Sequence, residues 1–258
     1  MELFSYIIIF IFGVSIGSFL NVLIDRLPRD ESINGRSHCD YCKKKLFWFD
    51  MFPVLSFFIL RGKTRCCNKK LSFQYPLVEF ITGLVFIIVI KDGPYIESLT
   101  RSVLILSILS SLIIIFVSDL KYHLISDYIL LALFVLSVFF HLTDSIRLYP
   151  ILSNFILAGL IVAFPIWLIY FISKERAMGL GDVYLAAIMG FLLGWQAGFL
   201  ALYIAFVTGA IYGLTVMIFK NKKLKNKIAF GPFLVIGTIT MLFWGERILE
   251  IIKKIYGF

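Results

Sequence analysis

Charged residues are scarce in this sequence of 258 residues: Asp, Glu, Lys and Arg together make up 16% of it. An ordinary water-soluble domain is roughly a quarter charged and about half apolar. Here 60% of the residues are hydrophobic and the mean hydropathy is +0.93. A single soluble core could not bury so much apolar surface and still keep a polar exterior. The composition therefore excludes an ordinary soluble domain and predicts a membrane protein.

Two further features are missing. The chain opens with Met1 and Glu2 and enters a long apolar run directly, without the basic start and small-residue cleavage site of a removable signal peptide. We therefore expect a retained first span. No internal repeat is visible in the sequence, which argues against a transporter built from inverted repeats.

The positive charge of the chain does not indicate a nucleic-acid partner. The formal net charge is +9, but the Lys and Arg residues lie in a few short stretches between apolar runs. Membrane orientation explains this distribution better than a nucleic-acid surface does, because cytoplasmic loops retain basic residues. We expect the lipid bilayer as a partner and no nucleic acid; the sequence leaves the oligomeric state open.

Apolar runs that can cross a bilayer, which takes about 20 residues each, recur along the chain. Five are separate, at residues 3–23, 75–90, 102–117, 128–142 and 151–172. Residues 183–219 form 37 positions without a charge. One helix of that length would measure about 55 Å, so we expect two helices with a turn near Gly190–Gly198. With a last run at 228–244, the sequence predicts an all-α, polytopic membrane protein with about eight transmembrane helices.

The distribution of basic residues predicts the orientation. With the N-terminus outside, 19 of the 25 Lys and Arg residues lie in the inward connections, 11 of them between Arg26 and Lys70 and five between Lys220 and Lys227. The positive-inside rule favours this arrangement. Three of the remaining six lie in the C-terminal tail, whose orientation the count leaves open: Arg247, Lys253 and Lys254.

Three regions follow from this reading: a first transmembrane helix at 1–24, a small cytoplasmic domain at 25–74, and a transmembrane domain at 75–258. The small domain holds all four cysteines, at positions 39, 42, 66 and 67. Cysteines grouped in this way indicate a metal or redox site more than a disulfide framework.

Two aspartates lie at the ends of predicted spans. Asp119 follows the apolar run that ends at Ser118, and Asp182 comes directly before the run that begins at Val183. Two complete spans separate them, and an even number of crossings returns the chain to the same side. Both carboxylates therefore belong at the cytoplasmic face in the predicted orientation. Ionisable residues at such positions are costly to desolvate and indicate a functional site.

A pair of carboxylates can hydrolyse a peptide bond when the two share one proton, since like charges a few ångströms apart cannot both ionise. One acts as base toward water and the other as acid toward the carbonyl oxygen. Gly179 and Gly181 would let a substrate backbone approach Asp182, because glycine has no Cβ atom. The alternative is that Asp119 and Asp182 only cap helices, Asp182 at the N-terminus of the sixth helix.

Several segments in this order resemble the type IV prepilin peptidase family, the aspartic membrane peptidases with a Gly-x-Gly-Asp motif. The segments are GSFLNV at 17–22, DRLP at 25–28, Cys39-x-x-Cys42, QYPLVE at 74–79, DLKYHLISD at 119–127 and GLGDV at 179–183. The match extends over most of the chain. The resemblance implies that Asp119 and Asp182 are the catalytic pair.

The resemblance further implies a function: removal of a short basic leader from prepilins or pseudopilins, on the carboxyl side of a glycine and at the cytoplasmic face of the bacterial inner membrane. The peptidase step would need no cofactor. Many family members then methylate the new N-terminal residue, usually phenylalanine, with S-adenosylmethionine, and their N-terminal cytoplasmic domain carries the cysteines. Type IV pili and type II secretion are the processes that such enzymes serve.

The chain departs from the family at its second cysteine pair, where Thr64 stands in place of the first cysteine of Thr64-Arg65-Cys66-Cys67. Zinc prefers four tetrahedral Cys or His ligands. Cys39, Cys42 and Cys67 with either Cys66 or His38 could still form such a site; reduced structural thiols or a disulfide are the alternatives.

Glu79 begins a predicted span, where a buried acid could bind a substrate amine or the basic leader; a cap or an ion pair is the alternative. Two other functions remain open on the sequence alone. A methyltransferase without peptidase activity would not need the two aspartates, and a transporter would use them as proton or cation sites.

Overall fold

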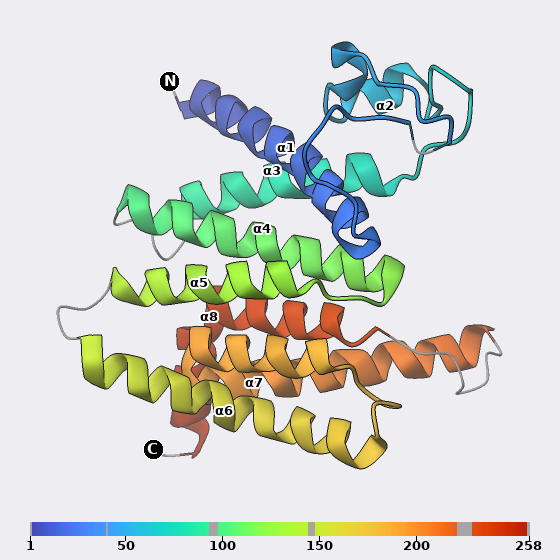
Figure 1. Cartoon of the computed structure of the whole chain (residues 1–258). Coiled ribbons are helices and arrows are strands. Elements are labelled where there is room, and N and C mark those ends of the chain that lie inside the picture. The colour runs from blue at the N-terminus through green and yellow to red at the C-terminus, as the bar shows by residue number, and fades with distance from the viewer. Residues whose placement is uncertain (1, 40, 93–97, 144–147, 221–228, 257–258) are drawn as a thin grey trace. The chain divides into compact units, whose positions relative to one another are not determined.

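The computed structural model describes residues 2–39, 41–92, 98–143, 148–220 and 229–256. Nearly all of the basic connection at Lys220–Lys227 lies outside them. The long helices are α1 (Glu2–Arg26), α3 (Gln74–Asp92), α4 (Leu99–Tyr122), α5 (Asp127–Leu142), α6 (Leu148–Ser173), α7 (Leu180–Lys220) and α8 (Gly231–Tyr256) (Figure 1). Between α1 and α3 lie α2 (Leu55–Ile59) and two 3-10 turns, Leu27–Arg29 and Trp48–Met51. The described residues form no named strand, so the expected all-α class is confirmed.

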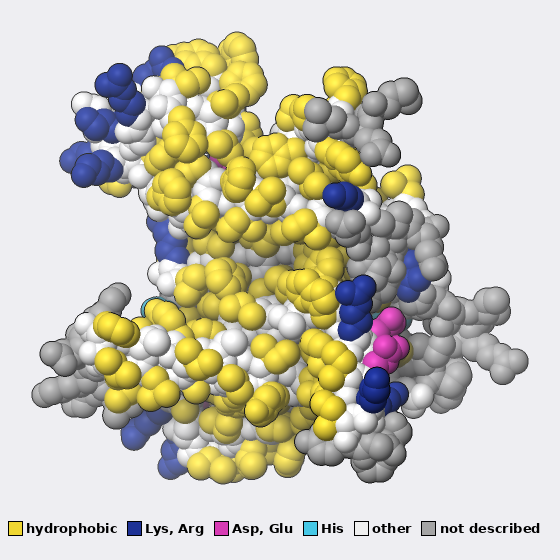
Figure 2. Space-filling model, turned by 180° about the vertical axis from the view of Figure 1, so that it is seen from behind, with side chains coloured by type: hydrophobic (Ala, Val, Ile, Leu, Met, Phe, Trp, Pro, Cys, Tyr) yellow, Lys and Arg dark blue, Asp and Glu magenta, His cyan; other side chains and the backbone are white. Residues whose placement is uncertain are grey.

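Five of the described helices are long and apolar enough to cross a membrane: α1, α3, α4, α6 and α7. The apolar helix α5 is shorter, with 16 residues. Large hydrophobic side chains are exposed along these helices, as on α6, where Leu160 is 63% and Phe164 56% exposed. Figure 2 shows such side chains covering the helices, as expected for a surface that faces lipid. The count of eight crossings stays a prediction.

The chain divides into two compact units, Met1–Ile114 and Ile115–Phe258, and the boundary falls inside α4. In the first unit α1 packs against α3. The helices approach closely because both carry glycine: a Cβ atom on Gly17 would lie 2.7 Å from Glu79 Cα, and one on Gly83 would lie 2.6 Å from Val14 Cγ2. Small residues allow such close packing between membrane helices.

The cysteine-containing segment of the first unit is built from two similar turns. In one, Cys39 N–H donates to Lys44 O and Lys43 N–H to Cys39 O; in the other, Thr64 N–H donates to Lys69 O and Asn68 N–H to Thr64 O. Thr64 thus occupies in the second turn the place that Cys39 has in the first. Lys and Arg side chains gather over this segment (Figure 2).

In the second unit α7 is not one straight helix. Gly194 has φ 78° and ψ 170°, a backbone conformation outside the helix and essentially restricted to glycine. A Cβ atom on Gly198 would lie 3.2 Å from Gly190 Cα, so the segments on either side of Gly194 meet side by side. The turn expected at Gly190–Gly198 is confirmed. Both halves pack on α6 through these glycines, with Val162 against Gly190 and Gly198.

Helix bounds differ from the sequence expectation mainly at the polar ends. The helix α4 continues past Val117 to Tyr122, so Asp119 lies inside its last turn and not after it. The helix α7 begins at Leu180 and places Asp182 in its first turn. The helix α8 runs on from Trp244 to Tyr256, because its last turns keep a helical pattern although they carry charges. Hydropathy alone marks where a helix becomes polar, not where it ends.

Candidate active site

Asp119 is buried in the last turn of α4, with 6% of its surface exposed. Its Oδ2 accepts a hydrogen bond of 3.0 Å from the backbone N–H of Gly231, the first residue of α8. The first N–H groups of a helix have no partner within the helix, and a carboxylate there is favourable. The N-terminus of α8 therefore fixes the position of Asp119.

Asp182 is also buried, at 8% exposure, in the first turn of α7. Its Oδ2 accepts a hydrogen bond of 3.1 Å from the N–H of Gly179, and its own N–H donates to Gly179 O at 3.2 Å. Both aspartates thus make the helix-capping contacts of the alternative reading. Each contact uses one oxygen of the carboxylate, so capping and a chemical role are compatible.

The two aspartates belong to the same unit, and a residue close to each of them lies against Ile125. A Cβ atom on Gly181 would lie 3.2 Å from Ile125 Cβ, and one on Gly231 would lie 3.2 Å from Ile125 Cδ1. Gly181, next to Asp182, and Gly231, whose N–H binds Asp119, therefore both lie against the side chain of Ile125.

The flanking glycines differ in what they do. Gly181 lies against Ile125, so its lack of a side chain serves packing. A Cβ atom on Gly179 would meet nothing closer than Asp182 Oδ2 at 3.7 Å, so the backbone there is open. Sequence reasoning missed Gly231 and Ile125; a Gly-Pro pair near the start of the last apolar run was the one available signal for Gly231.

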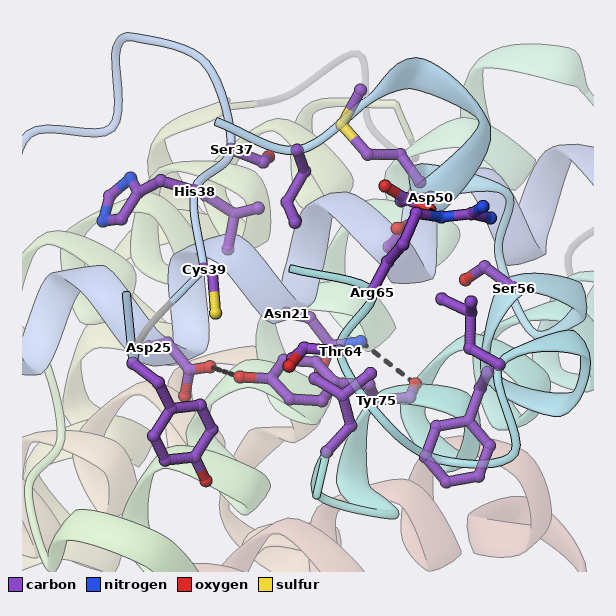
Figure 3. A pocket seen from close by; sticks show the side chains of 18 of the residues that line it. Asn21, Asp25, Ser37, His38, Cys39, Asp50, Ser56, Thr64, Arg65 and Tyr75 are labelled. Atoms are coloured by element: carbon purple, nitrogen blue, oxygen red, sulfur yellow. Dashed lines mark hydrogen bonds and ion pairs between the residues drawn. The ribbon is translucent and has the colours of Figure 1, made fainter. Parts of the chain in front are cut away.

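Glu79 lies in the first unit, on α3, and lines a pocket with residues of α1 and of the cysteine segment. Its Oε2 accepts a hydrogen bond of 2.6 Å from the N–H of Val54. Val54 has a φ of 60°, which is strained for a β-branched residue. Tyr75 lines the same pocket and joins the helices: its backbone O accepts from Asn21 Nδ2 at 3.1 Å and its hydroxyl donates to Asp25 Oδ2 at 2.7 Å (Figure 3).

The four cysteines meet in the first unit. Their sulfur atoms all lie within 4.8 Å of one another, with Cys39 and Cys67 3.7 Å apart and Cys42 and Cys66 3.1 Å apart. Four sulfurs around one zinc at about 2.3 Å would be separated by roughly 3.8 Å. The four thiols therefore fit a tetrahedral zinc ion, and the fourth sulfur is that of Cys66.

The hydroxyl of Thr64 takes part in the cluster without supplying a sulfur. It lies 3.1 Å from Cys67 Sγ and accepts from the N–H of Lys69 at 3.0 Å. The Thr64 hydroxyl lowers the pKa of the Cys67 thiol to about 7. The hydrogen bond with Cys42 raises the pKa of the Cys66 thiol to about 12. The two neighbouring thiols thus differ in how readily they ionise.

Comparison with known proteins finds a family for each of two segments of the chain and relatives along nearly its whole length. Residues 11–92 match the bacterial peptidase A24 N-terminal domain, and residues 106–214 match the type IV leader peptidase family. The chain is 30% identical to the prepilin leader peptidase/N-methyltransferase of Aeromonas salmonicida, over 93% of this chain and 91% of the relative. It is 30% identical to the protein of that name from Bacillus subtilis, over 96% and 97%. No solved structure matches the chain.

Proposed function

We propose that this chain, which belongs to the type IV leader peptidase family, removes the leader peptide of prepilins. Asp119 and Asp182 are the catalytic pair of this proposal. The chain is a multi-pass inner-membrane protein and a prepilin peptidase of that family. The observation that supports the pair is the burial of both aspartates in one unit, where Gly181, next to Asp182, and Gly231, which binds Asp119, both lie against Ile125.

The proposed chemistry uses two buried carboxyl groups that share one proton. The ionised member takes a proton from a water molecule as the water oxygen attacks the scissile carbonyl carbon. The protonated member donates its proton to the carbonyl oxygen, and the later return of a proton to the leaving amine completes hydrolysis. The hydrogen bonds from Gly231 and Gly179 hold Oδ2 of each carboxylate. This fixed geometry leaves Oδ1 of each to contact water and substrate.

The open backbone at Gly179 suits a substrate that approaches in an extended form, since no side chain stands between it and Asp182. Two helices, α5 and α6, separate the aspartates along the chain. Both carboxylates then lie at the same membrane face, and the basic connections make that face cytoplasmic. A prepilin leader that stays in the cytoplasm would reach the pair there.

The first unit supports a second step, methylation of the new N-terminus. Relatives that cover nearly the whole chain carry N-methyltransferase in their name. S-adenosylmethionine would supply the methyl group when bound. Zinc held by Cys39, Cys42, Cys66 and Cys67 would be a closed structural site that fixes the two turns of the cysteine segment against each other.

The test is cleavage of a prepilin-like substrate by the purified protein in detergent. Asp119→Asn and Asp182→Asn should each reduce the rate by about 10² to 10⁴-fold, because an amide can neither take nor give the proton. Asp127→Asn is the matched control, since Asp127 is an exposed acid in the first turn of α5. Full activity in either of the first two variants would overturn the assignment.

A further inference from the structure

Asn21 carries a buried acceptor that no described residue satisfies. Asn21 is 3% exposed, and its Oδ1 has no hydrogen-bond partner among the described residues. The orientation of the amide is fixed, because only Nδ2 can donate to the carbonyl oxygen of Tyr75. A buried polar atom without a partner costs about 1–3 kcal/mol. The Oδ1 atom therefore marks a place where the pocket in the first unit is incomplete without a donor.

Two buried acids line the same pocket as Asn21 and come from two helices that pack together, α1 and α3. Asp25 follows Asn21 by one turn on α1, and Glu79 follows Tyr75 by one turn on α3, so each pair lies on one helix face. Asp25 and Glu79 are each 8% exposed and line the same pocket as Asn21. Figure 3 shows Asn21, Asp25 and Tyr75 close together, with the hydrogen bonds from Asn21 to Tyr75 and from Tyr75 to Asp25 drawn as dashed lines.

Three arginines also line the pocket; Arg29 is exposed, and the other two donate hydrogen bonds elsewhere. Arg26 Nη1 donates to the backbone oxygens of Ser32 and Ile33 at 2.9 and 3.1 Å. Arg65 forms an ion pair of 2.9 Å with Asp50. The pocket measures about 200 Å³, whereas a cavity needs only about 10–15 Å³ on the same measure to hold one water molecule. A group larger than water, cationic and rich in donors, fits such a lining.

We propose that this pocket binds a primary ammonium group, with Asn21 Oδ1 as one of its acceptors. An ammonium has three donors and no acceptor, so it matches an amide oxygen between carboxylates. Two sources share this chemistry under the proposed function, on which the inference rests. One is the α-amino group that leader removal creates on the pilin, and the other is the amino group of S-adenosylmethionine.

Direct binding to the full-length protein in nanodiscs tests the proposal. One probe is a soluble peptide amide that begins with phenylalanine, compared with the same peptide acetylated at its N-terminus. The other probe is S-adenosylmethionine, compared with S-adenosylhomocysteine, which keeps the amino group but lacks the sulfonium charge. Thermophoresis or calorimetry gives the dissociation constants. The peptide comparison uses wild-type protein, so it does not depend on whether a variant folds.

Asn21→Leu removes the acceptor, and Asn34→Leu is the control, because Asn34 is exposed in the same unit. We expect the free amine to bind at least about tenfold more tightly than its acetylated form, and Asn21→Leu to remove that preference. A second result would identify the ammonium as that of the methyl donor. In it, the free and acetylated peptides bind equally, and both adenosyl compounds bind the wild type but bind Asn21→Leu about tenfold more weakly.

Two outcomes overturn the proposal. In the first, neither probe binds; in the second, N-acetylation and Asn21→Leu both leave the dissociation constant unchanged, as expected if the pocket holds only water. Leader cleavage by the same samples separates this failure from failure of the proposed function. Asn34→Leu should cleave as the wild type does, since Asn34 is exposed in the first unit and the aspartate pair lies in the other. If Asp119→Asn cleaves normally, the catalytic assignment fails, whatever the peptide comparison gives.

Discussion

Replacing Gly231 by alanine should impair cleavage although neither aspartate is replaced. A Cβ atom on Gly231 would lie 2.6 Å from Asp119 Oδ2 and 3.2 Å from Ile125 Cδ1. Ordinary contacts of a Cβ atom begin near 3.4 Å. The Asp119 carboxylate or the start of α8 must therefore shift by about 0.8 Å, which lengthens or misaligns the 3.0 Å hydrogen bond between them.

The expected loss follows from the sensitivity of catalysis to position. A misplacement of about 1 Å in a catalytic group can cost about a hundredfold in rate, so we expect kcat to fall about tenfold to a hundredfold in Gly231→Ala. The fold should persist, since alanine is a better helix former than glycine. Initial rates of leader removal at several substrate concentrations separate kcat from KM, and a thermal unfolding curve confirms the fold.

Gly245→Ala is the matched control in the same helix, because a Cβ atom there meets only the Met241 side chain, no closer than 3.4 Å. It should keep wild-type kcat. A folded Gly231→Ala protein that cleaves within twofold of the wild type would refute the reasoning. Either the placement of Asp119 would not depend on α8, or Asp119 would not act in the reaction.

Three further predictions concern the cysteine segment and the turn of α7. Chelation of metal should reduce methyl transfer, measured as mass gain of the product, more than leader removal, because the thiols and the aspartates belong to different units; equal losses would contradict this. In metal-free protein at pH 7, iodoacetamide should label Cys67 before Cys66, because the thiolate is the reactive form and the pKa values of the two thiols are about 7 and about 12. Mass spectrometry of the labelled peptides gives the order of labelling. Thr64→Val should slow the labelling of Cys67. Gly194→Ala should destabilise the protein by about 1–3 kcal/mol, seen as a lower unfolding temperature, whereas Gly209→Ala should not, because its Cβ atom would meet only ordinary contacts.

Much of the fold could be predicted from hydropathy and charge alone. The apolar runs place α1, α3, α4, α5 and α6 within a few residues of their observed bounds, and the length of the uncharged run predicts the turn at Gly194. These features are local, since a span must be long and apolar wherever it packs. Helix ends are less predictable, because a helix continues beyond the bilayer wherever its polar residues still support it.

The contacts that complete the sites could not be predicted in this way. The bond from Gly231 to Asp119 joins residues 112 positions apart, and the hydrogen bond from Val54 to Glu79 depends on a strained backbone. The choice of Cys66 as the fourth thiol depends on how the turn around Thr64 folds. Long-range packing decides each of these, whereas the motifs indicate only which residues carry chemistry.

The turn at Gly194 also bears on how the protein enters its membrane. Residues 183–219 contain no charge, so nothing at the tip of the hairpin could anchor it on one side. Orientation signals for both arms must come from the flanks, where Lys174 and Arg176 precede the hairpin and Lys220 follows it. During biogenesis the two arms should therefore insert together, and removing charge from one flank should reorient the pair and not a single arm.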